Sequence, residues 1–199
     1  MKHLCEQALE VLKGKTLATA ESCTGGGIGA ALTAIPGSSK VYKGGIISYT
    51  NEVKHKVLGV PVEILDAYGP VCAPVAQAMA EGARRVIGAD VAVAVTGLAG
   101  PDGDEFGNPV GTVFIGYADD KTAFAREYHF QGDRDAVRSQ AVNAALELAL
   151  HIRNTGYNVF LAGTPDLGRT YMLTDFLEPL ARKEATGFGL CYFANAQLK

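Results

Sequence analysis

The sequence predicts an α/β fold in which helices cover both sides of a mixed, mostly parallel sheet. Helix-like and strand-like segments alternate through the first half of the chain, as they do where crossover helices join parallel strands. Residues 91–97, VAVAVTG, are almost continuously apolar, which is typical of a central strand buried on both faces. Two apolar runs at 111–118 and 123–130 are separated by a short polar turn, and this spacing predicts a hairpin.

The other elements follow from the spacing of apolar residues and from glycine and proline. Apolar residues at helical spacing indicate a first helix that ends at Gly14. Pro74 suits the first turn of a later helix. The remaining expected elements are a strand at 16–20, a helix at 26–35, a strand at 44–49, the helix at 74–88 and a long helix at 135–152.

The composition favours a globular protein that acts on a small molecule. A formal net charge of −3 over 199 residues gives no basic face on which to seat a nucleic acid. No apolar run is long enough to span a membrane and the N-terminus is too charged for a signal peptide, so we expect a cytoplasmic protein without membrane contact. The four cysteines are scattered, so we expect buried, reduced thiols, with no disulfide framework, metal site or cofactor.

The stretch TLATAESCTGGGIGAALTA, residues 16–34, could be a phosphate cradle, a nucleophile turn or only a tight strand-to-helix connection. Backbone N–H groups at a helix start stabilise anions, whether a phosphate or the oxyanion of acyl transfer. Ser22 could be a nucleophile, but a serine hydroxyl needs a base. Alternatively, Ser22 or Thr24 is simply the helix N-cap.

The segment SYTNEVKHKVLGV, residues 48–60, could supply that base. Lys54, if it is removed from water, could lose its proton near neutral pH, and the Tyr49 hydroxyl could relay the proton. His55 is the more familiar base by residue type. Alternatively, the segment is a charged turn of helix with solvated lysines.

Two further loops could bind a ligand. Gly97 and Gly100 follow the predicted central strand, and α/β proteins usually bind ligands beyond the strand ends. Arg134 and Arg138 lie one helical turn apart, so both could face a phosphate. Alternatively, Asp133 caps that helix and the arginines pair with nearby carboxylates.

Taken together, these blocks closely resemble the C-terminal domain of the CinA family, which also occurs as stand-alone nicotinamide mononucleotide deamidases. The resemblance rests on AESCTGG at 20–26, ISYTNEVK at 47–54, GLAGPDG at 97–103 and GDRDAVRSQAV at 132–142. It implies a three-layer α/β/α sandwich and a serine amidohydrolase that needs no metal. The implied reaction converts nicotinamide mononucleotide to nicotinic acid mononucleotide and ammonia. CinA proteins often carry a further N-terminal domain, which we expect to be absent here.

The resemblance also implies roles for single residues. Ser22 matches the family's nucleophile, and Tyr49 and Lys54 match its base-side partners. Backbone N–H groups from Cys23 to Gly26 would hold the oxyanion. The expected substrate-binding residues are Thr24, Gly25, Gly26, Asn51, Gly97, Gly100 and Arg138.

Residues 155–199 depart from this pattern, and we predict an appended strand-loop-helix tail beside an amidohydrolase domain at 1–154. The tail resembles the start of the ATPase region of Lon-type proteases, and residues 163–170 fit the P-loop spacing. Arg169 stands where that loop needs lysine, so we expect no nucleotide hydrolysis. A strand at 157–162 could pair with a sheet edge of a neighbouring subunit and form a homo-oligomer.

Two alternatives to the deamidase stay open at this point. The first is a non-catalytic nucleotide-binding or protein-interaction module that uses the tail as its binding element. The second is an amidase that acts on a related pyridine nucleotide or another small amide.

Overall fold

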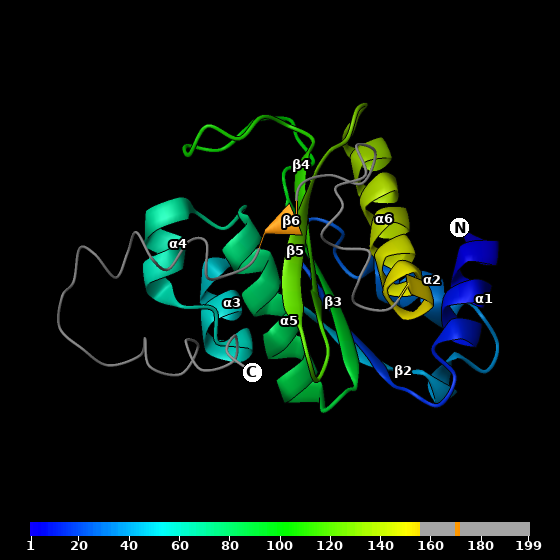
Figure 1. Cartoon of the computed structure of the whole chain (residues 1–199). Helices are drawn as coiled ribbons and strands as arrows, with labels where there is room; N and C mark the ends of the chain where they lie inside the picture. Colours follow the sequence, from blue (N-terminus) through cyan, green and yellow to red (C-terminus); the bar gives the residue numbers. More distant parts are fainter. Residues whose placement is uncertain (156–169, 172–199) are drawn as a thin grey trace, which may run out of the picture.

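A computed structural model describes residues 1–155 and 170–171, in which helices lie on both faces of one sheet (Figure 1). The expected α/β/α layers are confirmed. The predicted tail, with its strand at 157–162 and its P-loop spacing at 163–170, lies almost entirely outside the described residues. The elements in chain order are α1 (Lys2–Val11), β1 (Leu17–Glu21), α2 (Gly27–Thr33), η1 (Ser38–Lys40), β2 (Tyr42–Ile47), α3 (Asn51–Leu58), α4 (Val62–Tyr68), α5 (Ala73–Ile87), β3 (Val91–Gly97), β4 (Thr112–Ala118), β5 (Ala123–His129), α6 (Arg134–Thr155) and β6 (Thr170–Tyr171).

The sheet is mixed, as predicted, with the strand order β2-β1-β3-β4-β5-β6, but the expectation of mostly parallel pairs is wrong: among the described strands two pairs are parallel and three are antiparallel. β1 pairs in parallel with β2 and with β3. The β3–β4, β4–β5 and β5–β6 pairs are antiparallel, and β4 and β5 form the predicted hairpin. The parallel pairs involve only β2, β1 and β3, because no helix lies between β3 and β4 or between β4 and β5 to carry the chain back across the sheet.

Strand β3 is buried along its length up to Thr96, as its apolar run predicted. Its valines and alanines alternate, so they face opposite sides of the sheet. The valines join an apolar cluster with residues of α1, α2 and α6, and the alanines join a second cluster with residues of α5. These small side chains let α5 lie close to the sheet: a Cβ atom at Gly116 of β4 would lie 2.0 Å from the Ala76 carbonyl oxygen.

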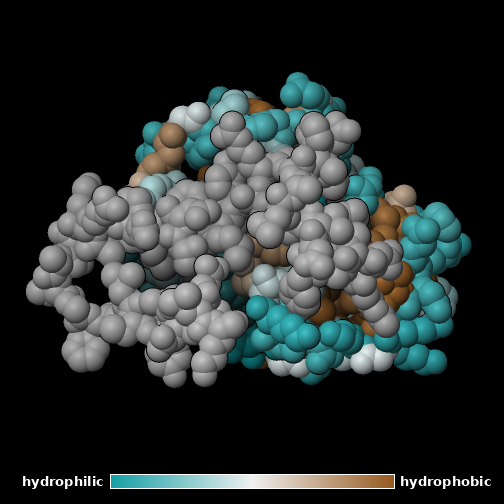
Figure 2. All heavy atoms as spheres, in the orientation of Figure 1, coloured by the Kyte–Doolittle hydropathy of each residue, from teal (hydrophilic) through white to brown (hydrophobic). Residues whose placement is uncertain are grey.

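The helices divide between the two faces of the sheet. Helices α1, α2 and α6 lie on one side, and α3, α4 and α5 lie on the other (Figure 1). Helix α3 confirms the expected turn of charged helix, whereas the sequence had given no expectation for α4. Apolar side chains are visible over α6 in the space-filling view (Figure 2). Within the residues described, no helix combines the length and apolar character needed to cross a membrane.

Candidate active site

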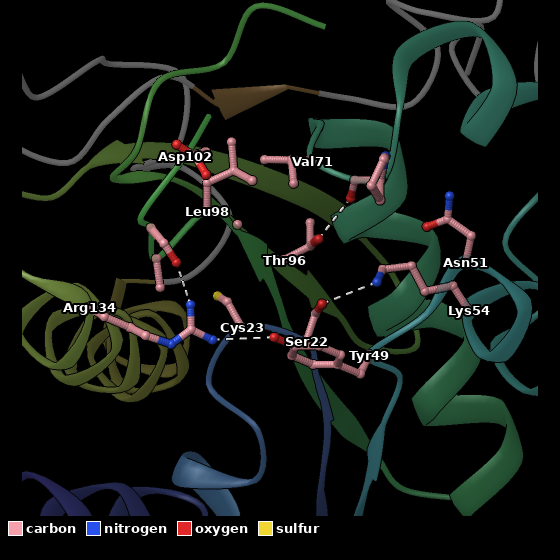
Figure 3. Close-up of a pocket in the computed structure, with 14 residues that line it drawn as sticks. Ser22, Cys23, Tyr49, Asn51, Lys54, Val71, Thr96, Leu98, Asp102 and Arg134 are labelled. Atoms are coloured by element: carbon pink, nitrogen blue, oxygen red, sulfur yellow. Dashed lines mark hydrogen bonds between the residues drawn. The ribbon is translucent and has the colours of Figure 1, made fainter. Parts of the chain in front are cut away.

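A cavity of about 280 Å³ lies at the edge where the carboxyl ends of β1, β2 and β3 meet (Figure 3). This is the edge at which open α/β sheets bind ligands. The turn after β1, the start of α3, the loop after β3 and the start of α6 all contribute to it. The polar and glycine residues that line the cavity are Ser22, Cys23, Tyr49, Asn51, Lys54, Thr96, Gly97, Gly100, Asp102 and Arg134.

Ser22 and Lys54 meet in this cavity. The Lys54 Nζ atom donates a hydrogen bond to Ser22 Oγ at 3.1 Å and a second one to the Ser48 carbonyl oxygen at 2.9 Å. Lys54 is only 1% exposed and Ser22 is 8% exposed. Burial of the ammonium lowers the pKa of Lys54 from 10.5 to about 8. A lysine with this pKa can act as a base near neutral pH, so the alternative of solvated lysines is wrong for Lys54.

Local sequence explains why Lys54 faces inward. Helix α3 begins directly after β2, where the Thr50 hydroxyl caps it by accepting a hydrogen bond from Val53 N–H at 3.3 Å. Lys54 and Leu58 lie one turn apart on the same helical face, and both are buried. Packing of Leu58 against the apolar cluster beneath α5 therefore turns Lys54 toward the end of β1.

Glu21 occupies the N-terminus of α2. Its carboxylate is 2% exposed and accepts hydrogen bonds from the N–H groups of Gly26, Ile28 and Gly29 at 3.0, 3.1 and 3.0 Å. Neither Ser22 nor Thr24 caps this helix, so that alternative is wrong. Because a carboxylate already fills the anion site of the helix, the phosphate-cradle interpretation fails as well. What is left is a turn that presents Ser22.

Tyr49 and His55 take different positions relative to Ser22. Tyr49 lines the cavity and is 60% exposed, and its hydroxyl accepts a hydrogen bond from Arg134 at 3.3 Å (Figure 3). Arg134 also donates to the Gly100 carbonyl oxygen at 2.6 Å. His55 does not line the cavity, and its Nδ1 lies 2.9 Å from the Val60 carbonyl oxygen. Between the two candidate bases, the geometry therefore favours Lys54.

The thiol of Cys23 lies in the same cavity as the Ser22 hydroxyl. Burial raises the pKa of Cys23 to about 11, so the thiol stays protonated at neutral pH. The side chain that contacts the buried amine is the neighbouring serine. Ser22 is accordingly the better candidate for a nucleophile.

The structure divides the expected substrate-binding residues into two groups. Asn51, Gly97 and Gly100 line the cavity. Thr24, Gly25, Gly26 and Arg138 do not.

The separation has local causes. Thr24 is only 1% exposed, and the Gly26 N–H group is bound by Glu21. The Arg138 guanidinium donates to the carbonyl oxygens of Cys23 and Thr24, both at 3.1 Å. Asp133 caps α6 by accepting a hydrogen bond from Ala136 N–H at 2.9 Å, which confirms the capping part of that alternative, whereas Arg134 donates to the Gly100 carbonyl oxygen and the Tyr49 hydroxyl rather than to a carboxylate.

Two polar lining residues, Thr96 and Asp102, had no expected role, whereas Cys23 was expected only through its backbone N–H and Arg134 only as one of two arginines able to face a phosphate. The sequence offered Arg134 as one of two arginines one turn apart, but spacing alone could not show which of them turns toward the cavity. Thr96 is the last buried residue of β3, so its place at a strand end was the available signal. Among the side chains that the structure describes, no group of three or more from His, Cys, Asp and Glu could hold a metal ion.

Comparison with known proteins decides the family. The sequence-family model described as the CinA C-terminal domain matches residues 1–152. The chain belongs to this family. The CinA match thus ends where the predicted tail begins, and the expected resemblance of the tail to Lon-type proteases finds no support.

Individual CinA relatives agree with this assignment. A putative competence-damage inducible protein of Desulforamulus reducens is 50% identical over 138 residues, and a CinA-like protein of Geobacter metallireducens is 51% identical over 134 residues. These matches cover 69% and 67% of this chain. The chain spans about a third of the length of these relatives, at 33% and 32%.

Solved CinA structures share the fold. The crystal structure of a competence-damaged protein (CinA) superfamily protein from Klebsiella pneumoniae is 35% identical, with a TM-score of 0.75, over 77% of this chain and 97% of that one. The competence/damage inducible protein of Agrobacterium tumefaciens is 38% identical, with a TM-score of 0.73, over 77% of this chain and 95% of that one. The α/β fold with its mixed sheet is therefore the fold of the family.

Proposed function

We propose that the chain hydrolyses the carboxamide of nicotinamide mononucleotide to nicotinic acid mononucleotide and ammonia. The observation that carries the proposal is the buried contact between Lys54 Nζ and Ser22 Oγ at 3.1 Å. The family includes nicotinamide mononucleotide amidases, which makes this substrate the first to test. The cavity beside the pair is open to a small ligand.

The first half of the reaction forms an acyl-enzyme. A neutral Lys54 amine keeps one N–H for the Ser48 carbonyl oxygen, and its lone pair accepts the proton of the Ser22 hydroxyl. Ser22 Oγ attacks the carboxamide carbon, and the carbonyl becomes an oxyanion. When the intermediate collapses, the Lys54 ammonium passes its proton to the leaving nitrogen, which departs as ammonia.

The second half returns the enzyme to its starting state. A water molecule gives a proton to Lys54 and attacks the Ser22 ester. Collapse of this intermediate releases the carboxylate product, and Ser22 takes the proton back. No proton relay through Tyr49 is required for the first step, because Lys54 contacts Ser22 directly.

One lining residue, Arg134, suits a phosphorylated substrate, although the Asp102 carboxylate lines the same cavity. Arg134 lines the cavity and makes two contacts, to the Tyr49 hydroxyl and the Gly100 carbonyl oxygen. A phosphate can compete for these donors because charge-assisted, two-pronged hydrogen bonds to arginine are stronger than neutral ones. We assign phosphate recognition to Arg134 rather than to the glycines of the α2 turn.

Ammonia release from nicotinamide mononucleotide by the native protein and by Ser22→Ala tests the proposal. We expect release by the native protein and a loss of about 1,000-fold or more in the variant, because the nucleophile is gone. Ser39→Ala is the matched control, since Ser39 is an exposed serine outside the cavity and should keep native activity. Equal rates for Ser22→Ala and native protein would remove Ser22 as the nucleophile.

A panel of pyridine nucleotides and other small amides separates this substrate from related ones. If folded native protein releases no ammonia from any of them, the amidase proposal is refuted and the non-catalytic alternative stands. The buried Ser22–Lys54 pair supports the enzyme, since a binding module gains nothing from burying a lysine beside a serine.

A further inference from the structure

Arg138 holds the turn that carries Ser22 through two backbone carbonyl groups. Its Nε and one of its terminal nitrogens donate to the carbonyl oxygens of Cys23 and Thr24, both at 3.1 Å. Arg138 itself does not line the cavity, and its other terminal nitrogen lies 3.7 Å from the exposed Asp135 carboxylate. This guanidinium is therefore committed to the backbone of the turn rather than to a ligand.

The two carbonyl contacts fix the direction of the N–H groups of Thr24 and Gly25, which belong to the same peptide units. In a trans peptide the C=O and the next N–H point in opposite directions, and within the described residues only the Gly100–Pro101 bond is cis. With its carbonyl held by Arg138, the Cys23–Thr24 peptide must turn the Thr24 N–H away from the guanidinium. The next peptide behaves in the same way, and the Gly25 N–H donates to the Ser22 carbonyl oxygen at 3.0 Å.

Most amides of this turn already have partners. The Ser22 N–H donates to the Val95 carbonyl oxygen at 2.9 Å, the Gly26 N–H to Glu21 at 3.0 Å, and the Gly27 N–H to the Thr24 carbonyl oxygen at 3.2 Å. Among the described contacts of the turn, the Thr24 N–H has no acceptor and the Cys23 N–H faces only its own thiol, so these two groups are the candidates to stabilise an oxyanion on the substrate of Ser22.

We propose that Arg138 is a positioning residue that holds the Cys23–Thr24 peptide by its carbonyl, which sets the direction of the Thr24 N–H and holds the Cys23 backbone beside Ser22, so that the oxyanion donors stay in place. The Glu21 carboxylate accepts a hydrogen bond from an N–H group of the same turn, and the Arg138 guanidinium donates to its carbonyl oxygens. Side chains of opposite charge therefore hold the backbone of the turn. This inference rests on the proposed amidase function, and it replaces the expected role of Arg138 as a substrate ligand. Arg134, one helical turn earlier, is the arginine that faces the cavity.

The test compares Arg138→Ala, Arg138→Lys, Arg134→Ala and the control Arg84→Ala. Arg84 is a matched control because its Nε also donates to a backbone carbonyl, that of Asp90 at 3.1 Å, but outside the cavity. Rates are measured with nicotinamide mononucleotide and with nicotinamide riboside, which lacks the phosphate. Thermal midpoints establish that each variant is folded.

For Arg138→Ala we expect kcat to fall about 10-fold to 100-fold on both substrates with little change in KM, since loss of an oxyanion donor costs about 100-fold to 1,000-fold and a misaligned donor costs less. Arg138→Lys should fall between native protein and Arg138→Ala, because one ammonium cannot hold two carbonyls as a fork does. Added guanidinium ion should restore part of the Arg138→Ala activity. Arg134→Ala should instead lose the preference for the phosphorylated substrate.

Two results would overturn the proposal: a raised KM with kcat kept, or a loss confined to the phosphorylated substrate, which would make Arg138 a phosphate ligand. An Arg138→Ala rate equal to that of Arg84→Ala would equally exclude a positioning role.

Labelling of Ser22 by a fluorophosphonate separates this inference from the choice of substrate, because its transition state also needs the oxyanion donors. If neither amide is hydrolysed, slower labelling of Arg138→Ala than of Arg84→Ala still supports positioning, and equal labelling refutes it. Native protein that is not labelled at all refutes both the nucleophile and its positioning.

Discussion

The burial of Lys54 predicts how activity depends on pH. If Lys54 must be neutral to accept the Ser22 proton, kcat/KM should rise with pH, pass half of its maximum near pH 8 and level off above it. At pH 7 a lysine with an ordinary pKa of 10.5 is about 0.03% neutral, whereas a pKa of about 8 gives about 9%. Burial therefore increases the reactive fraction at pH 7 by about 300-fold.

The assay measures the initial rate of ammonia release from pH 6 to pH 10 at substrate concentrations well below KM. Full recovery of activity after return to pH 8 establishes that the protein survives each pH. Lys54→Met keeps an unbranched side chain of similar length and removes the base. We expect its kcat/KM at pH 8 to be lower by about 1,000-fold or more, with no recovery at higher pH. Lys56→Met is the matched control, because Lys56 lies on the same helix but is exposed and pairs with Glu52 at 2.7 Å.

This reasoning has clear points of failure. A native profile that is flat from pH 6 to pH 10, or one that still rises tenfold per pH unit up to pH 9.5 as an ordinary lysine pKa of 10.5 would give, would show that a buried Lys54 with a lowered pKa is not the base. Lys54→Met with more than a tenth of native activity would show that another group accepts the proton. If Lys56→Met lost as much kcat/KM as Lys54→Met, the effect would come from surface charge in general and not from Lys54.

Three further predictions concern the stability of the fold. Between pH 8 and 10.5 the unfolded chain keeps the Lys54 proton that the folded chain has lost. The free energy of unfolding relative to that of Lys54→Met, measured by urea titration, should therefore increase by about 1 kcal/mol from pH 7 to pH 9. A constant difference would contradict the lowered pKa of Lys54. Glu21→Gln should lower the free energy of unfolding by about 2 kcal/mol, because an amide cannot accept the three N–H bonds of α2 as a carboxylate does; an unchanged urea midpoint would refute this. Gly82→Ala should lower the free energy of unfolding by about 3 kcal/mol in the same assay, since the new Cβ atom would lie 2.1 Å from the Leu58 carbonyl oxygen. Helix propensity alone would make this variant more stable, and that result would contradict the close packing of α3 on α5.

Periodicity and composition predicted most of the elements. The strand 91–97, the hairpin and the long last helix were expected because their apolar patterns are continuous or strongly periodic. Helix α4 gave no such signal, since it has only 7 residues and, unlike the equally short α2, is not an alanine-rich stretch that follows glycines. Periodicity also could not predict the number of parallel strand pairs, because that number depends on which connections between strands contain a helix.

The candidate site was predicted in part. Ser22 and Lys54 were expected to lie together, and they do. The glycines after Ser22 looked like a free anion site, but the sequence did not show that Glu21, the residue before the serine, folds back into it. Arg134 and Arg138 could not be ranked from the sequence, because residues four apart share a helical face but not the same partners.

The sequence by itself determined the family, the layered α/β architecture and the residue types able to attack an amide. These depend on local pattern and on short blocks of neighbouring residues. Only the tertiary structure decided that Lys54 is buried against Ser22, that Glu21 fills the helix terminus and that Arg138 donates to the carbonyl oxygens of the turn. The physical reason is that burial, charge pairing and the direction of a peptide group are set by segments far apart in the chain: β1, α3 and α6 meet at one edge of the sheet only after the chain has folded.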